Sequence, residues 1–203
     1  MTVTSNIRPT LILASTSPRR QELITTLGLP VMVRPSHADE KTPGDWSPDR
    51  IVEELANRKA RAVWESVRGT MKTAAVVVGS DTIVVLDGRV MGKPKDPEEA
   101  FEMLSRLAGN THEVYTGVSC IGLMDGQTVT NHRVTKVRMR QLSPDQIRRY
   151  VQTGEPLDKA GAYGVQGVGA LLVDSLEGCY FNVVGLPLSL LAVQLEQFGV
   201  TLP

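Results

Sequence analysis

The chain has little cysteine and few aromatic residues. Cys120 and Cys179 are the only cysteines in 203 residues, and they lie far apart in the sequence. This excludes a disulfide framework and a Cys-x-x-Cys zinc site, and a reducing compartment is the simplest setting for the protein. Aromatic residues make up 4% of the chain. We therefore expect a core built mainly from aliphatic side chains, without the stacking surfaces that bind single-stranded nucleic acid.

The sequence also lacks an excess of either charge and any long apolar run. Lys and Arg together number 22, as do Asp and Glu, whereas proteins that bind duplex nucleic acid normally carry a basic excess. No apolar run approaches the roughly 20 residues that cross a bilayer. The first ten residues, MTVTSNIRPT, lack the charged-then-apolar order of a signal peptide. We expect a soluble cytoplasmic protein with no nucleic-acid and no membrane partner.

Four helix starts are marked by a capping residue followed at once by proline. The capping side chain can accept a hydrogen bond from a free N–H of the first turn, where proline has no N–H to lose. Ser143 is also followed three residues later by Gln146, which completes a capping box. The pattern predicts helices over residues 18–27, 48–67, 97–108 and 144–153, and apolar spacing predicts a last helix over 187–198.

Strand-like runs and hairpin turns lie between these helices. Asp-Gly or Glu-Gly pairs separate neighbouring runs at three places, as in two-residue hairpins. The expected strands cover residues 11–14, 31–34, 74–78, 81–86, 89–91, 114–123, 128–139, 170–176 and 180–184. Strands that alternate with helices, but also form hairpins, indicate an α/β fold with a mixed sheet and flanking helices.

A candidate anion site follows the first strand, in the segment Ser15-Thr16-Ser17-Pro18-Arg19-Arg20. Hydroxyl groups, free N–H groups and the positive end of the helix dipole meet there. Two arginines are unfavourable at that end of a helix unless a phosphate accompanies them, because arginine binds phosphate oxygens bidentately. A solvated helix start with two surface arginines explains the same residues.

A second candidate is Asp81, which interrupts the apolar run from Val76 to Val85. A buried carboxylate is costly unless it is paired or bound to a metal, although an aspartate at the end of a strand can project into a cleft. Lys93 lies beyond the adjacent hairpin and could return to the same cleft. Asp39-Glu40 and Lys59 read equally well as solvated charges.

The third candidate is the glycine-rich stretch over residues 154–169. Its small residues allow a ligand close to the backbone N–H groups, Gln166 could offer an amide edge to a base, and Tyr163 a ring or a hydroxyl. A flexible turn would have the same composition. The three histidines, His37, His112 and His132, show no ligand spacing, and we assign them no catalytic role.

Together these segments resemble the Maf family of nucleoside triphosphate pyrophosphatases. The resemblance covers almost the whole chain and is carried by LILASTSPRRQEL, GSDTIV, GRVMGKP, MLSRLAGNTHEVYTGV, GEPLDKAGAYGVQG and NVVGLPL. It implies a fold like that of inosine triphosphate pyrophosphatase, with residues 1–203 forming one domain whose two lobes enclose a central cleft, and a homodimer. It also implies hydrolysis of a nucleoside triphosphate to the monophosphate and pyrophosphate with a divalent cation, Mg²⁺ or Mn²⁺.

The resemblance also implies the site residues. Asp81 falls on the family's proton acceptor. The other members of the site fall on Ser15, Arg19, Arg20, Glu40, Lys59 and Lys93, and the positions linked to base choice on Arg19, Thr82 and Gln166. We expect the four cationic residues to hold the phosphates, and Glu40 with Asp81 to hold the metal.

Within the family, the chain is similar to the branch that hydrolyses dTTP and UTP, which carries SPRR, SDT and DKAGAYGIQG. Here Val165 replaces the isoleucine of that last motif. The amide of Gln166 can match two groups on the edge that uracil and thymine share, whereas cytosine reverses one of them. Two alternatives stay open: a house-cleaning pyrophosphatase of broader or methylated-nucleotide specificity, and a nucleotide-sensing regulator of cell division.

Overall fold

The computed structural model describes residues 9–71 and 74–202, and within these ranges the chain forms a mixed sheet of seven strands. Strand β1 (Thr10–Leu13) runs parallel to β2 (Val31–Val33) and to β3 (Ala75–Leu86), and the other pairs are antiparallel. The other strands are β4 (Arg89–Met91), β5 (Thr111–Gly122), β6 (Thr128–Met139) and β7 (Val173–Glu177). The order is β2-β1-β3-β5-β6-β7, with β4 on β3. The α/β class with a mixed sheet is therefore confirmed.

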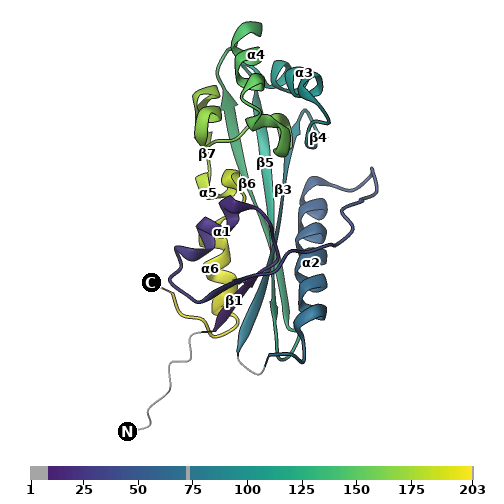
Figure 1. The fold of residues 1–203 in the computed structure, drawn as a ribbon, viewed down its shortest axis with the longest axis vertical. Helices are drawn as coiled ribbons and strands as arrows, with labels where there is room; N and C mark the ends of the chain where they lie inside the picture. Colours follow the sequence, from purple (N-terminus) through teal and green to yellow (C-terminus); the bar gives the residue numbers. More distant parts are fainter. Residues whose placement is uncertain (1–8, 72–73, 203) are drawn as a thin grey trace.

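The molecule is elongated because three long strands run from one end to the other (Figure 1). β3, β5 and β6 have 12 residues each, and at the usual rise of a strand each is about 40 Å long. The short strands β1 and β2 widen one half of the sheet, and β4 and β7 widen the other. The three long strands are thus a frame shared by both halves.

Helices cover both faces of the sheet. The helix α2 (Pro48–Val67) lies along one face, and the others cover the opposite face (Figure 1). The helices of that opposite face are α1 (Pro18–Thr25), α5 (Tyr180–Val184) and α6 (Leu188–Glu196) in the half with β1, and α3 (Pro97–Leu107) and α4 (Pro144–Gln152) in the other half. Two 3-10 helices, η1 (Glu155–Asp158) and η2 (Ala160–Ala162), lie with α3 and α4, and a third, η3 (Gly167–Leu172), lies beside β7.

Alternation along β3 sorts the core into these layers. Val77 and Val85 pack among residues of α2, whereas Val78 packs against α1 and α6, and Val84 against α3 and α4. Because successive side chains of a strand point to opposite faces, the apolar clusters on the two faces follow from the run of valines in the sequence.

The helix starts agree with the predictions. The helices α1 to α4 all begin at the proline of a cap-Pro pair. Asp96 accepts a hydrogen bond from the Glu99 N–H at 2.8 Å, and Ser143 forms both bonds of its capping box with Gln146. Ser17, in contrast, makes no cap bond with its side chain. The first turn of α1 therefore keeps its N–H groups free of that side chain.

One predicted strand is wrong. Residues 180–184, expected as a strand of a hairpin, form the short helix α5. Their apolar and β-branched composition favours a strand, but the outer edge of β6 is already paired with β7. The buried side chain of Asn182 instead ties the segment to the face of the sheet, where its amide donates to the Val114 carbonyl at 2.9 Å and to Thr135 Oγ1 at 3.0 Å. The strand expected over 170–176 likewise begins only at Val173, because η3 precedes it.

The first ten residues lack the features of a signal peptide in their sequence, and residues 1–8 lie outside the described residues. In the part of the chain that the structure describes, none of the helices combines the length and the apolar character that crossing a membrane requires.

Candidate active site

A cleft opens between the two halves of the molecule, at a gap along one edge of β3. The pairing of β1 with β3 ends at Leu13 and Val78, and the next residue, Ala14, donates its N–H to the Val78 carbonyl at 2.8 Å. Pairing with β4 begins only at Val84. Between these two points, no described strand pairs with this edge of β3. The cleft therefore reaches side chains on both faces of the strand.

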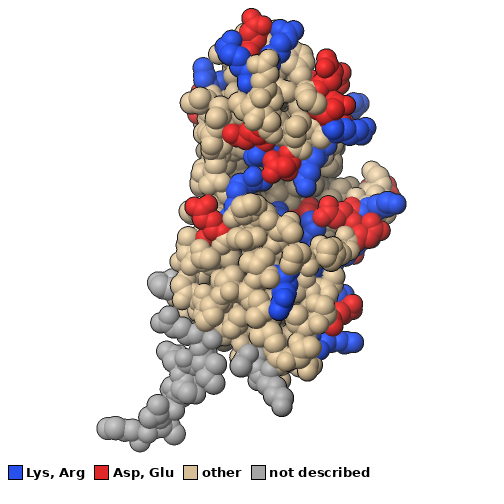
Figure 2. Space-filling view, viewed as in Figure 1, with Lys and Arg blue, Asp and Glu red and all other residues tan. Residues whose placement is uncertain are grey.

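The cleft has a volume of about 840 Å³, within the range of pockets that bind small molecules. One wall comes from the segment that joins β1 to α1 and from the first half of the loop between β2 and α2, and the facing wall comes from the turn after β4 and the glycine-rich segment. Charged side chains of both signs gather around a hollow at mid-height of the molecule (Figure 2). Every candidate site residue lines this cleft: Ser15, Arg19, Arg20, Glu40, Lys59, Asp81, Thr82, Lys93 and Gln166.

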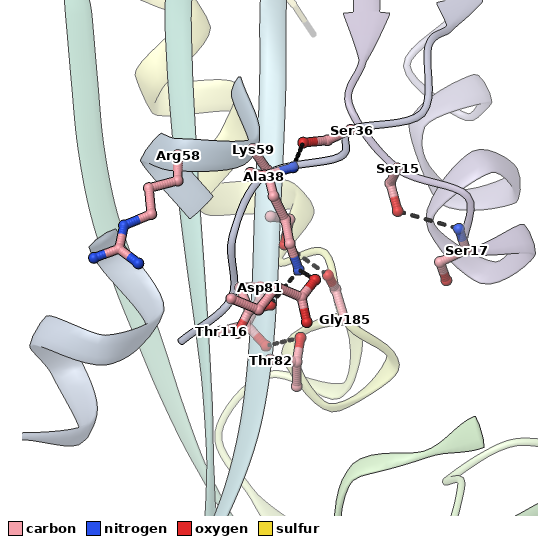
Figure 3. A network of polar contacts seen from close by, with 12 residues as sticks. Ser15, Ser17, Ser36, Ala38, Arg58, Lys59, Asp81, Thr82, Thr116 and Gly185 are labelled. Carbon is pink, nitrogen blue, oxygen red and sulfur yellow. Dashed lines mark hydrogen bonds and ion pairs between the residues drawn. The ribbon is translucent and has the colours of Figure 1, made fainter. Parts of the chain in front are cut away.

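Lys59 joins two carboxylates at the centre of the cleft (Figure 3). Its Nζ lies 2.6 Å from Asp81 Oδ1 and 2.7 Å from Glu40 Oε1. The side chains of Lys59 and Asp81 are 13% and 11% exposed, and that of Glu40 is 61% exposed. Asp81 Oδ2 has no hydrogen-bond partner among the described residues. The buried aspartate thus has one oxygen held by a cation and one oxygen available to a ligand.

Close packing of α2 on the sheet places Lys59 there. A side chain at Gly79 would collide with the Ala56 carbonyl and with Ala60, so glycine allows the helix to lie directly on β3. Asp81 lies two residues further along the strand and therefore projects from the same face as Gly79. Lys59 lies next to Ala60 in the same turn of α2, and its side chain therefore contacts Asp81.

The pKa of Glu40 reflects this neighbourhood. Burial alone would raise it, but the hydrogen bond and charge of Lys59, with the charges of Lys93 and Arg20, outweigh burial and hold the pKa below its ordinary value. Glu40 is therefore a carboxylate at neutral pH, and its second oxygen is available to a cation.

Arg20 lies on the other face of β3, where a chain of hydrogen bonds anchors it. Its Nη2 donates to Thr82 Oγ1 at 2.9 Å, the Thr82 and Thr116 hydroxyls are 2.9 Å apart, and Thr116 donates to the Asn182 carbonyl at 2.8 Å. Arg20 Nε also donates to the Gly185 carbonyl at 2.8 Å. The guanidinium is thus fixed in orientation before any ligand arrives.

Burial lowers the pKa of Arg20 from its ordinary value; the carboxylates of Asp81 and Glu40 oppose this effect, and the charge of Arg19 adds to it. A phosphate in the cleft would raise the pKa of Arg20, as the carboxylates do. Of the two adjacent arginines, it is Arg20 that touches Thr82. Arg19 instead approaches Asp158 across the cleft, at 3.8 Å between Nη1 and Oδ2.

The start of α1 contributes hydroxyl and N–H groups to the cleft. Ser15 is buried and accepts a hydrogen bond from the Ser17 N–H at 3.1 Å (Figure 3). Together with the uncapped first turn, this arrangement fits the anion site expected from the sequence.

The facing wall carries Lys93 and Gln166. Lys93 is exposed and follows β4. Gln166 precedes η3, is half-buried, and its amide has no hydrogen-bond partner among the described residues. Both side chains are therefore free to meet a ligand.

Arg58, for which the sequence predicts no role, holds the loop that carries Glu40. Arg58 Nη1 donates to the Lys41 carbonyl at 2.8 Å and to the Asp39 carbonyl at 3.3 Å. Its Nε bonds Glu54 at 2.8 Å. In Figure 3 its side chain points away from the Lys59–Asp81 pair. One arginine of a charge-rich helix carries no signal that it contacts this loop.

None of the three histidines is a lining residue of the cleft. His112 is buried in β5, where its Nε2 lies 2.7 Å from the Tyr163 hydroxyl, and burial lowers its pKa to about 4. His132 pairs with Glu53 at 2.7 Å.

The donor set of the cleft suits a hard divalent cation that arrives with phosphate. Within residues 9–71 and 74–202, no three His, Cys, Asp or Glu side chains form a group that could hold a metal ion alone. Asp81 and Glu40 nevertheless both contact Lys59 Nζ, and each keeps a second oxygen that Lys59 does not bind. Mg²⁺ is commonly bound by one or two carboxylates together with substrate phosphates.

Comparisons with known proteins show which proteins this chain is similar to. The family model described as "Maf-like protein" matches residues 10–198. A protein of Desulforamulus reducens named dTTP/UTP pyrophosphatase is 52% identical over 194 residues, covering 96% of this chain and 98% of the relative. A protein of Moorella thermoacetica with the same name is 53% identical over 190 residues, covering 94% and 95%. A solved dITP/XTP pyrophosphatase from Mycobacterium abscessus covers 92% of this chain and 93% of its own at 15% identity, with a TM-score of only 0.43.

Proposed function

The chain belongs to the Maf family, and on that premise we propose that it is a nucleoside triphosphate pyrophosphatase that hydrolyses dTTP and UTP to the monophosphate and pyrophosphate. The two relatives described above, which share about half of their residues with this chain, carry the name of that activity. The observation that carries the proposal is the Lys59 ammonium between Asp81 and Glu40, at 2.6 and 2.7 Å, in a cleft lined by four further cationic side chains, those of Arg19, Arg20, Lys93 and Lys159.

The cations bind the triphosphate. Arg20 presents a guanidinium already fixed by Thr82 and Gly185, so little conformational freedom is lost when it grips a phosphate. Arg19 exchanges Asp158 for phosphate oxygens, and Lys93 approaches from the facing wall. Their charges neutralise the pyrophosphate that leaves.

Asp81 prepares the attacking water. Lys59 holds Oδ1, which leaves Oδ2 to accept a proton from the water as its oxygen attacks the α-phosphorus. The bond between that phosphorus and the bridging oxygen to the β-phosphorus breaks, and its electron pair leaves with pyrophosphate. Asp81 and Glu40 would hold a divalent cation, Mg²⁺ or Mn²⁺, together with the phosphates. When bound, the cation would supply charge withdrawal from the phosphate oxygens and a lower pKa for bound water.

The glycine-rich wall reads the base. Uracil and thymine share an N3–H donor between two carbonyl acceptors. The unpartnered amide of Gln166 offers one acceptor and one donor group to that edge, and cytosine mismatches one of them. Leaving a buried polar group unpaired costs about 1–3 kcal/mol, which is enough to prefer dTTP and UTP over CTP.

The test is a steady-state panel with dTTP, UTP, CTP and 7-methyl-GTP, with monophosphate, pyrophosphate and inorganic phosphate measured separately. We expect the highest kcat/KM for dTTP and UTP, equal amounts of monophosphate and pyrophosphate, and loss of activity in excess EDTA. Release of inorganic phosphate, or a preference for the methylated nucleotide, would refute the proposed function. Nucleotide binding without turnover would favour a sensor.

A further inference from the structure

A single carboxylate closes the glycine-rich segment into a fixed loop. Glu155 Oε1 accepts from the Tyr150 hydroxyl at 2.9 Å and from the Gly169 N–H at 3.0 Å, and Oε2 accepts from the Val168 N–H at 3.0 Å. These bonds join α4 and η1 to the start of η3. Between their ends lies Gln166.

The surroundings of Glu155 are built for this contact. A side chain at Gly169 would meet the Tyr150 hydroxyl at 2.6 Å and Glu155 Oε1 at 2.9 Å, and one at Gly167 would meet Glu155 Oε2 at 2.9 Å. Gly167 also has φ +65°, which glycine adopts without strain. The two glycines therefore let the backbone fold directly onto the carboxylate.

Tyr150 extends the contact to the other end of the loop. Its hydroxyl donates to Glu155 and accepts from the Gly164 N–H at 3.3 Å. Burial raises the pKa of Tyr150, and the hydrogen bond to Glu155 raises it further, so the hydroxyl keeps its proton for this bond. The backbone is thus tied on both sides of Gln166, at Gly164 and at Val168.

We propose that Glu155, with Tyr150, is the positioning residue for base selection, because it fixes the loop that presents the unpartnered amide of Gln166 to the cleft. The inference rests on the proposed function, in which Gln166 reads the base. On a loose loop the amide of Gln166 would shift relative to the base and lose its match to uracil, whereas a fixed loop holds the amide opposite the N3–H donor and one carbonyl of the base. Rigidity of the loop therefore supplies selectivity.

Glu155→Gln tests this with the smallest change in shape. The new amide nitrogen would face a backbone N–H of Val168 or Gly169, donor against donor, and the contact would open. We expect the UTP-to-CTP ratio of kcat/KM to fall about tenfold, mainly through KM for UTP, with kcat for UTP changed little. Tyr150→Phe removes one of the bonds and should lower the ratio less.

A double-mutant comparison separates positioning from general destabilisation. Gln166→Ala removes the amide itself, and in that background Glu155→Gln should not lower the ratio further. Glu102→Gln is the matched control, because Glu102 is exposed on α3 and has no partner among the described residues. It should leave both kinetic constants unchanged.

The outcomes are distinct. If Gln166→Ala lowers the ratio but Glu155→Gln and Tyr150→Phe leave it intact, the positioning role is wrong while the proposed function stands. An effect of Glu155→Gln that adds fully to that of Gln166→Ala also overturns it. If the wild-type protein hydrolyses UTP and CTP equally, the proposed base reading fails, and this inference fails with it. Should Glu155→Gln not fold, Tyr150→Phe decides by the same ratio.

Discussion

Replacement of Gly79 by alanine should separate Lys59 from Asp81. A Cβ at this position would lie 2.7 Å from the Ala60 nitrogen and 2.9 Å from its Cβ, where ordinary contacts begin at 3.4 Å. The helix α2 must therefore retreat from β3 by about 1 Å, and overpacking of this kind costs about 1–3 kcal/mol of stability. A misplacement of about 1 Å in a catalytic group can cost about 100-fold in rate. We expect a loss of that order in kcat for UTP.

The assay combines thermal unfolding with kinetics below the unfolding transition of the variant. Gly44→Ala is the matched control, because no atom lies within 4 Å of the Cβ it would add and its φ is not in the left-handed region. It should leave stability and kcat unchanged. Wild-type stability together with wild-type kcat in Gly79→Ala would refute the argument that close packing of α2 positions Lys59.

Two further predictions concern Glu40. Arg58→Ala removes the anchor of the loop that carries Glu40 and should lower kcat/KM about tenfold at limiting metal concentration, and saturating metal should reduce this loss. The control is Arg61→Ala, an exposed change on the same helix, which should leave kcat/KM unchanged. Equal effects of the two substitutions would contradict the anchoring role of Arg58. The lowered pKa of Glu40 implies that its pair with Lys59 stabilises the fold above the ordinary pKa and is lost as the pH falls through the lower pKa of the folded state. Urea unfolding measures the free energy of unfolding of the wild type and of Glu40→Gln. The wild type should be more stable by about 1 kcal/mol or less near pH 6, because the pair is so exposed, and this difference should disappear by about pH 3. A difference in the free energy of unfolding that stays constant across that range would contradict the pairing of Glu40 with Lys59.

Local signals in the sequence were sufficient for most of the fold. The cap-Pro pairs gave the starts of α1 to α4, because capping and the fixed φ of proline act within one turn. The prediction of a strand over residues 180–184 was wrong because apolar composition does not specify which part of the protein a segment packs against. The hydrogen bonds of Asn182 to β5 and β6 overrode local preference.

The site residues likewise divide into those that the sequence predicts and those that depend on tertiary contacts. Asp81 could be singled out because a carboxylate in an apolar run is costly, and the family resemblance pointed to the residues that the cleft brings together. Arg58, Glu155 and Gly185 could not be assigned roles, because each acts on a segment remote in sequence: the loop around Glu40, the start of η3, and Arg20. Their functions depend on tertiary contacts that no local pattern encodes.

The most direct measurement is pyrophosphate release from UTP by Asp81→Asn. Asparagine keeps the size of the side chain and an oxygen for Lys59, but it cannot accept the proton of the attacking water. We expect a folded protein that binds UTP with a KM close to that of the wild type and whose kcat is lower by at least about 100-fold. A folded Asp81→Asn variant that releases pyrophosphate at the wild-type rate would contradict the account.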